Sequence, residues 1–255
     1  MVSRRADAEA ALHDACMAAH LPGPFVGQES FMTADGILAL ARSAGVEAET
    51  SVLDVCCGTG GPGRLIVRRF GCAYTGVDAD AEAVALARER AAGLPCTYSV
   101  LTVPPLPAGT FDVLLLLETV LAFRDKRALA TAVAGALRPG GRFACTLEAG
   151  MPLTPTERAV MPAPDTVWPV PVDDFVTTLA GVGLATVSIE DDTAAQLRVV
   201  TALLAQFTAN RDRIAAALGT AFTDDLLVSH RLWRDWMSSG RIRKVALVAQ
   251  KTTKP

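Results

Sequence analysis

The sequence predicts an α/β fold built on a doubly wound, mostly parallel sheet of seven strands. Three observations carry this prediction. Short apolar runs alternate with helical patterns from residue 51 onward. The run over residues 113–117 is apolar throughout, as expected of a central strand buried on both faces. A long helical pattern over residues 192–240 separates the last two strands, where a hairpin needs only a few residues.

Two helices are expected before the sheet begins. In residues 6–20, Ala, Leu, Met and Cys recur at helical spacing, and the Leu-Pro-Gly-Pro sequence at 21–24 then breaks the helix. Residues 33–43 form the second helix, with the hydroxyl of Thr33 as its N-cap.

Each remaining element follows from its local pattern. Apolar runs of strand length predict the strands, at residues 51–55, 74–77, 97–101, 111–117, 142–148, 184–190 and 243–250. Helical spacing predicts the helices between them, at residues 61–70, 81–92, 127–137, 173–180, 194–218 and 224–238. The helix over 127–137 stops at the Arg-Pro-Gly-Gly sequence that follows it.

We expect a single domain over residues 1–255. It consists of an N-terminal helical segment (1–45), a cofactor-binding core (51–150), a loop with six prolines (150–172) and a helical cap inserted between the last two strands (192–240). A loop of that length is usually functional or mobile.

Composition narrows the class of protein. The formal net charge is −3, without the basic excess of a general nucleic-acid binder. The apolar run at 113–117 is far shorter than the roughly 20 residues of a membrane span. Acidic residues interrupt the stretch after Arg4 and Arg5, so no secretory signal is expected. We therefore expect a cytoplasmic enzyme with a small-molecule substrate, no nucleic-acid partner and no membrane partner; the oligomeric state stays open.

The cysteines and the basic residues indicate no further chemistry. The six cysteines form no CxxC pair and no Cys/His zinc spacing, so we expect reduced thiols and no metal site. We interpret the basic cluster of Arg241, Arg243 and Lys244 as a solvated strand end.

A glycine-rich turn follows the first strand of the expected sheet. Residues 58–63, Gly-Thr-Gly-Gly-Pro-Gly, match the pattern G-x-G-x-x-G, and Asp78 lies about 20 residues further on, where a dinucleotide fold has its ribose-binding acid. One interpretation is therefore a nicotinamide or flavin enzyme, and another is a turn needed only for packing.

Three features favour a cationic ligand with an amino group and a sulfonium. Asp54 stands directly before the glycines, where its charge would repel a pyrophosphate. Pro62 removes an N–H donor that a phosphate would use. The chain also ends without a second mononucleotide-binding half.

Residues 52–60, Val-Leu-Asp-Val-Cys-Cys-Gly-Thr-Gly, resemble the signature loop of class I S-adenosylmethionine-dependent methyltransferases, which have a Rossmann-like fold. Three further segments resemble the same family in order and spacing. They are the second strand with its acid (74–78), the lead into the fourth strand (109–113) and the turn before the fifth (137–143). The resemblance covers roughly residues 25–150 and the last strand, and it does not identify the acceptor.

The resemblance implies roles for the polar side of the cofactor site. Asp54 and the backbone of Gly58 and Gly60 would hold the methionine part of S-adenosylmethionine. Asp78 would accept hydrogen bonds from both ribose hydroxyls. Gln28 precedes the core, and we expect its amide to bind the methionine carboxylate; a plain loop leading into the helix is the equal alternative.

The adenine side departs from the family pattern. Ala79 would pack beside the adenine, and Thr102 and Val103 would flank it, although the family often has an aspartate in that loop. Cys56 stands where glycine is usual, within the cofactor loop. Adenine would then be held by a hydroxyl or by backbone groups.

Two residues are candidates for catalysis. Glu118 ends the fourth strand, and the resemblance implies that it faces the cofactor's methyl group or the acceptor. His230 lies in the helical insertion, and histidine transfers protons near neutral pH. The alternatives are an acid at a helix start for Glu118 and a surface residue of a packed cap helix for His230.

Aromatic residues predict the acceptor's character. Trp233 is three residues from His230 on one helix face, and Trp168 lies in the proline-rich loop. Together with Phe25 and Phe207, they predict a pocket for an apolar or aromatic small molecule.

The functional prediction is methyl transfer from S-adenosylmethionine to a small organic acceptor, in the biosynthesis of a specialised metabolite. One alternative keeps the cofactor but catalyses a non-methylating step such as cyclisation. The others are a nicotinamide-dependent oxidoreductase and a non-catalytic binding module.

Overall fold

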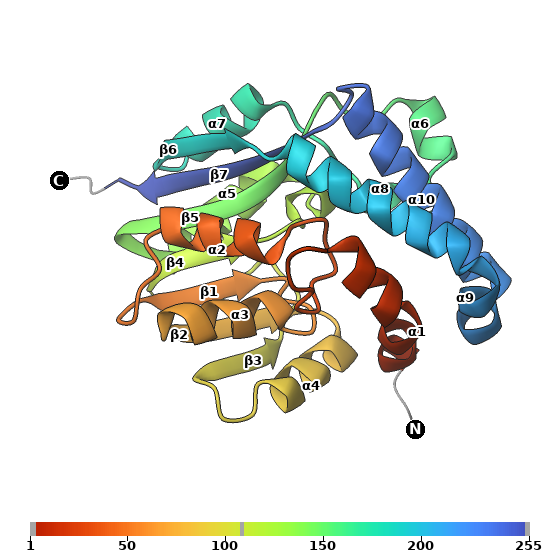
Figure 1. The fold of residues 1–255 in the computed structure, drawn as a ribbon. Coiled ribbons are helices and arrows are strands. Elements are labelled where there is room, and N and C mark those ends of the chain that lie inside the picture. The colour runs from red at the N-terminus through yellow and green to blue at the C-terminus, as the bar shows by residue number, and fades with distance from the viewer. Residues whose placement is uncertain (1–3, 108–109, 253–255) are drawn as a thin grey trace.

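A computed structural model describes residues 4–107 and 110–252, drawn as a ribbon in Figure 1. Seven strands form one sheet in the order β3-β2-β1-β4-β5-β7-β6. The strands are β1 (Ser51–Val55), β2 (Ala73–Asp78), β3 (Cys96–Val100), β4 (Phe111–Leu116), β5 (Leu137–Ala149), β6 (Leu184–Asp191) and β7 (Arg243–Lys251). β1 to β5 pair in parallel, and β7 runs antiparallel to β5 and β6. The predicted α/β class and doubly wound sheet are therefore confirmed.

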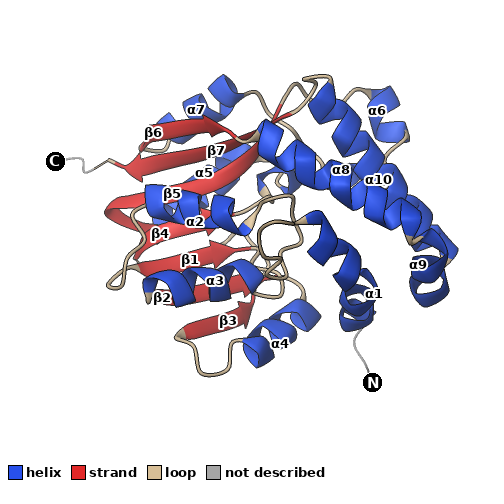
Figure 2. Cartoon of the chain, in the orientation of Figure 1, coloured by secondary structure: helices blue, strands red, loops and turns tan. Residues whose placement is uncertain are grey.

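Helices cover both faces of the sheet (Figure 2). In chain order, the helices up to the sixth strand are α1 (Arg4–Ala19), α2 (Ala34–Ser43), α3 (Gly61–Phe70), α4 (Ala81–Arg90), α5 (Lys126–Ala136), α6 (Pro155–Ala159) and α7 (Val172–Ala180). Between β6 and β7 lie α8 (Thr193–Ala209), α9 (Arg211–Leu218) and α10 (Thr220–Ser238). The hydroxyl of Thr33 accepts a hydrogen bond from the Gly36 N–H, which confirms it as the N-cap of α2.

The central strand β4 shows why the core has two halves. Leu114 and Leu116 pack into the cluster on the side of α5 and α7, whereas Val113 and Leu115 pack into the cluster on the side of α2, α3 and α4. Successive strand residues point to opposite faces, so an unbroken apolar run buries both of them.

Several predicted boundaries need correction. The expected helix over 194–218 is divided at Asn210 into α8 and α9, because asparagine competes with the helix through its side chain, whose amide bonds the Gln206 carbonyl. The proline-rich loop contains α6, whose N-cap Thr154 and residue Glu157 form a capping box. A short 3-10 turn, η2 (Pro164–Thr166), follows it, and another, η1 (Val120–Ala122), follows β4.

The helices α1, α8, α9 and α10 pack on one another beyond the carboxyl ends of the parallel strands (Figure 1). Their shared core includes Ala15, Leu203, Phe207 and Ile214. Within residues 4–107 and 110–252, no helix has both the length and the apolar character required to cross a bilayer.

Candidate functional site

The glycine loop after β1 has the backbone that a bound ligand requires. Gly58 and Gly60 have left-handed φ values of 53° and 72°, and Gly60 is the N-cap of α3. The Cys57 N–H donates to the Val77 carbonyl at 3.1 Å, which ties the loop to the end of β2. A Cβ on Gly61 would lie 2.4 Å from the Val26 carbonyl oxygen, so the N-terminal segment packs directly on this turn. The loop is thus held from both sides.

Cys56 takes a backbone conformation that is usual for glycine. Its φ is 60°, a region that side chains other than Asn, Asp and Gly seldom adopt. The side chain packs against the core on the α5 side. Burial, together with the nearby charges of Asp78 and Asp54, raises the pKa of its thiol to about 12, so the thiol stays neutral. Cys56 therefore keeps the turn at the cost of a strained backbone.

Asp78 stands at the end of β2 with its carboxylate already oriented. Its Oδ2 accepts a hydrogen bond from the Gly58 N–H at 2.9 Å, and its Oδ1 accepts one from the Asp80 N–H, also at 2.9 Å. The side chain is half-buried at the edge of the loop. Each carboxylate oxygen retains a lone pair, so the group can accept two further hydrogen bonds from neighbouring hydroxyls.

Asp54 lies beneath the loop rather than in it. It is 2% exposed, and its carboxylate accepts a hydrogen bond from the Tyr74 hydroxyl on β2. Burial raises the pKa of Asp54 to about 7, against the lowering effect of the Tyr74 bond. Its bond to Tyr74 makes it a support of the strand end, and its contact with the methionine part of a cofactor stays a prediction.

Gln28 is bound by its own segment. Its Oε1 accepts from the Val26 N–H at 2.8 Å, and its Nε2 donates to the Met32 carbonyl at 3.0 Å. Gln28 thus closes the loop beside the glycine turn, as the plain-loop alternative expects, and its contact with the methionine carboxylate stays a prediction. Phe31, from the same segment, donates its N–H to Glu118 Oε2 at 3.4 Å.

The residues expected beside adenine lie in the loops that follow β2 and β3. Ala79 and Thr102 are exposed, and Val103 packs against the core. The Leu101 N–H donates to the Asp78 carbonyl at 2.8 Å, which brings this loop to the end of β2. Gly109, at the start of the family-like segment 109–113, lies outside the described residues.

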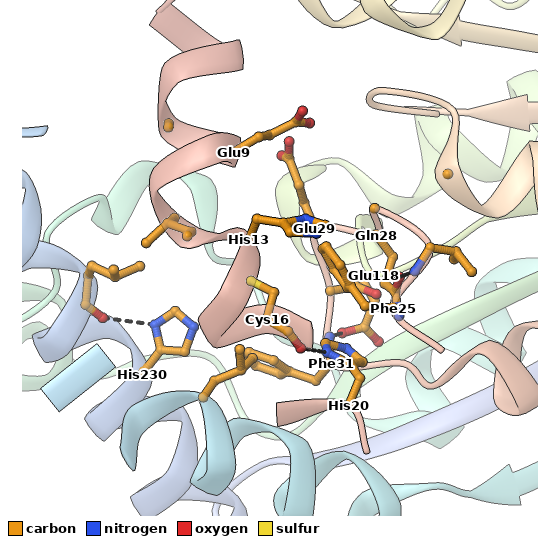
Figure 3. A pocket seen from close by; sticks show the side chains of 18 of the residues that line it. Glu9, His13, Cys16, His20, Phe25, Gln28, Glu29, Phe31, Glu118 and His230 are labelled. Carbon is orange, nitrogen blue, oxygen red and sulfur yellow. Dashed lines mark hydrogen bonds between the residues drawn. The ribbon is translucent and has the colours of Figure 1, made fainter. Parts of the chain in front are cut away.

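A cavity of about 1010 Å³ lies between the carboxyl edge of the sheet and the helices α1, α8 and α10. Figure 3 shows part of its lining, with side chains from α1, the following segment and α10. Most of the wall is apolar or aromatic, and its larger members are Leu12, Phe25, Phe31, Leu121, Leu203, Phe207, Leu226 and Trp233. Gly61 also lines it, so the cavity adjoins the glycine turn.

A buried ion network forms part of the same lining. Lys244 Nζ lies 2.8 Å from Glu118 Oε2 and 2.6 Å from Glu148 Oε1, and the three side chains are 3%, 7% and 1% exposed, respectively. They come from the start of β7, the residues after β4 and the end of β5. Burial lowers the pKa of Lys244, but the two carboxylates outweigh it and raise that pKa above its ordinary value, so the ammonium stays charged.

Glu118 has a strained backbone, as Cys56 does. Its φ is 58°, and these two are the only non-glycine residues with positive φ in the part of the chain that the structure describes. The Glu118 N–H donates to the Thr146 hydroxyl at 2.5 Å, which holds the turn. Strained residues of this kind are concentrated at functional sites, and both occur at the carboxyl edge of neighbouring strands.

His230 faces the cavity from α10. Its Nδ1 donates to the Leu226 carbonyl at 2.8 Å, since a carbonyl can only accept, and this leaves Nε2 as the lone-pair nitrogen. Burial lowers the pKa of His230, so the ring is neutral near pH 7. Phe207 packs edge-on against the imidazole, with ring centroids 4.9 Å apart. A neutral imidazole in such a wall can accept a proton.

Comparisons with known proteins agree with this geometry. Residues 52–141 match the family described as a methyltransferase domain. A phosphoethanolamine N-methyltransferase of Triticum aestivum is 28% identical over 197 residues, which cover 75% of this chain and 39% of that enzyme. A fatty-acid O-methyltransferase of Mycolicibacterium smegmatis is 36% identical over 109 residues, covering 42% of this chain and 39% of the relative. Residues 52–141 are therefore similar to a methyltransferase domain.

Solved structures share the fold of this chain. A phosphoethanolamine N-methyltransferase 2 of Haemonchus contortus in complex with S-adenosyl-L-methionine has a TM-score of 0.76 at 18% identity, over 99% of this chain and 61% of that one. The cyclase SpnF has a TM-score of 0.74 at 18% identity, over 98% of this chain and 96% of that one. The matched parts span less than half of the curated wheat relative.

The structure leaves Trp168 out of the cavity lining, which corrects the prediction that it lines the acceptor pocket. Its indole N–H donates to the Asp165 carbonyl at 3.0 Å, and the guanidinium groups of Arg124 and Arg158 lie 4.8 and 4.0 Å from its ring centre. Trp168 therefore fixes the proline-rich loop. Trp233, by contrast, lines the cavity together with His230, and its contact with the acceptor stays a prediction.

Sequence reasoning missed the ion network and two histidines. Lys244 was interpreted as part of a solvated strand end, yet it is buried; only its neighbour Arg243 is largely exposed. The sequence signal for this burial is the apolar run that directly follows Lys244. In the structure, Lys244 stands opposite Glu148 in the antiparallel register. His13 and His20 also line the cavity, so all three histidines of the chain do.

Proposed function

We propose that this protein transfers the methyl group of S-adenosylmethionine to a small, largely apolar organic acceptor bound in the cavity. The observation that carries the proposal is the position of that cavity, which has aromatic walls and adjoins the glycine turn through Gly61. An acceptor in this space would be shielded from water, and alignment with water excluded is what this transfer mainly requires.

The residues around the glycine turn fit the cofactor. The oriented carboxylate of Asp78 has acceptor capacity for the two ribose hydroxyls. Gly58 and Gly60 let the ligand approach the backbone. We propose that Ala79, Thr102 and Val103 form the adenine side. Asp54, Cys56 and Gln28 would shape the turn and its cover from behind.

Bound S-adenosylmethionine supplies a methyl group on a positively charged sulfur that is a good leaving group. The chain has to orient the acceptor and, for an acceptor that must lose a proton, remove it. His230 Nε2 is the proposed proton acceptor, because the ring is neutral and faces the cavity. Glu118 would orient the acceptor from the floor of the cavity, and N-, O- and C-acceptors all remain compatible with these roles.

A biosynthetic step in specialised metabolism is the proposed context, supported by the cavity of about 1010 Å³ beneath the helical cap. A non-methylating reaction on the same fold is the second candidate, because the fold covers nearly the whole of both this chain and the cyclase SpnF. A nicotinamide-dependent oxidoreductase is the third, although the order of strands and the methyltransferase-domain match count against it.

Two measurements test the proposal. Calorimetry with S-adenosylhomocysteine and, separately, with the reduced nicotinamide cofactor should detect binding of the first alone. Incubation with S-adenosylmethionine and a panel of small aromatic amines, alcohols and acids should then release S-adenosylhomocysteine, measured by mass spectrometry. Binding of the nicotinamide cofactor alone would refute the proposal, and a converted acceptor without S-adenosylhomocysteine would favour the cyclisation alternative.

A further inference from the structure

The floor of the cavity carries more hydrogen-bond acceptors than the protein fills. Glu118 Oε2 and Glu148 Oε1 each bind Lys244, but Glu118 Oε1 and Glu148 Oε2 are buried and have no hydrogen-bond partner among the described residues. Unpartnered buried oxygens are costly, and in native proteins they point to a missing donor. All three residues line the cavity, but the two unpartnered oxygens are themselves covered, so a donor in the cavity reaches them once the carboxylate group turns.

The cation of the network is engaged by the protein. Lys244 Nζ donates to both carboxylates, and the rings of Phe31 and Trp233 each lie with their centres 5.2 Å from it. Two of the three ammonium N–H groups thus have carboxylate acceptors, and the two aromatic rings add cation–π attraction. Lys244 therefore holds the two carboxylates together.

The charges of the network do not balance. Counted as ionised, the two carboxylates and the ammonium sum to −1 within the network. Elsewhere the cavity is lined by two further carboxylates, Glu9 and Glu29, and by the guanidinium groups of Arg64, Arg68 and Arg90. A buried charge of this kind is stabilised by a partner of opposite sign. A ligand that donates hydrogen bonds and carries a positive charge satisfies both the empty oxygens and the imbalance, and aromatic rings nearby favour cations as well.

We propose that Glu118 and Glu148 form the anchor for an ammonium head group, so that the acceptor is an apolar or aromatic molecule with a primary or secondary amine. This proposal rests on the proposed function, because it names the class of acceptor for the same cavity. The last torsion of a glutamate side chain is broad, and its rotation brings the buried oxygen of Glu118 to a donor above it. Lys244 is a positioning residue that holds the two carboxylates side by side.

A matched series of indoles tests the head group directly. Tryptamine, tryptophol and indole-3-propionate share ring and linker and end in an ammonium, a hydroxyl and a carboxylate. With S-adenosylhomocysteine present, calorimetry should show tryptamine binding at least tenfold more tightly than indole-3-propionate, with tryptophol between them. Equal affinities, a preference for the carboxylate, or no binding of tryptamine would overturn the proposal.

Variants then locate the anchor. Glu118→Gln and Glu148→Gln should each bring the affinity ratio of tryptamine to tryptophol close to one. Glu190→Gln, an equal change of charge at an exposed position on β6, should leave that ratio unchanged. A ratio that survives in both anchor variants refutes the assignment. If one variant does not fold, the wild-type series still tests the proposal. If the protein binds S-adenosylhomocysteine but shows no preference for tryptamine, the anchor is wrong and the proposed function is not affected.

Discussion

Replacing Lys244 by methionine tests the ion network most sharply, because it removes the ammonium and keeps an unbranched apolar stem. Glu118 and Glu148 would then remain buried with no cation between them. Removing one partner of a buried ion pair typically costs about 3–5 kcal/mol. For a chain of this size, that loss corresponds to a fall in melting temperature of roughly 10 °C.

The loss should depend on pH in a defined direction. Two neighbouring buried carboxylates cannot both ionise easily, so in the variant the pKa of at least one rises above its unfolded value. An acid whose pKa is higher in the folded protein than in the unfolded chain stabilises the fold fully at pH values below its unfolded pKa. This contribution to the free energy of unfolding is lost as pH rises through the folded pKa. In the wild type, burial raises the pKa of Glu148 even though Lys244 lowers it in part, and Lys244 itself stays charged. The variant should therefore lose more stability at pH 8 than at pH 5.

Denaturant unfolding followed by circular dichroism at the two pH values measures this loss. The matched control is Arg243→Met on the same strand, whose pair with Asp191 is exposed, with side chains 54% and 48% accessible. Such a pair contributes under about 1 kcal/mol, with little change between the two pH values. A loss in Lys244→Met no larger than in the control, or larger at pH 5 than at pH 8, would refute the reasoning.

Three further predictions concern the cofactor site. Asp78→Ala should keep the fold and weaken S-adenosylhomocysteine binding by about 100-fold or more, since charged hydrogen bonds contribute about 1.5–3 kcal/mol each; unchanged affinity by calorimetry would contradict the ribose assignment. Gly61→Ala places a Cβ 2.4 Å from the Val26 carbonyl and should cost about 1–3 kcal/mol in unfolding free energy, whereas Gly135→Ala, with no atom within 4 Å, should be neutral or stabilising. Burial raises the pKa of Asp54 to about 7, so the stability that its protonated form contributes to the protein is lost as pH rises through 7. Asp54→Asn should therefore lessen the fall in unfolding free energy between pH 5 and pH 8. An identical fall in both proteins would exclude the burial argument.

The sequence was sufficient for the sheet and for the turn after β1. An apolar run such as residues 113–117 can only be satisfied between two layers of helices, and the glycines with Asp78 specify where the chain must bend. The conformation of Cys56 could not be predicted from the sequence. Cysteine seldom adopts a left-handed φ, and here the packing of the thiol against the core accompanies that conformation.

The acceptor side was less predictable, because its residues meet only after folding. Trp168 and Trp233 looked equivalent as large aromatic residues, but one is held between two arginines and the other lines the cavity. Lys244 looked solvated beside Arg241 and Arg243. Its burial follows from strand register, because it stands opposite Glu148. That pairing depends on the antiparallel strand β7, which is the last strand in the chain.

A crystal structure with S-adenosylhomocysteine bound tests the central claim most directly. The account predicts both ribose hydroxyls on the Asp78 carboxylate, the amino-acid part against the turn of Gly58 and Gly60, and the sulfur directed at the cavity that Glu118 and His230 line. The account would be contradicted by a ligand bound away from this turn, by a ribose that makes no contact with Asp78, or by a sulfur directed away from the cavity.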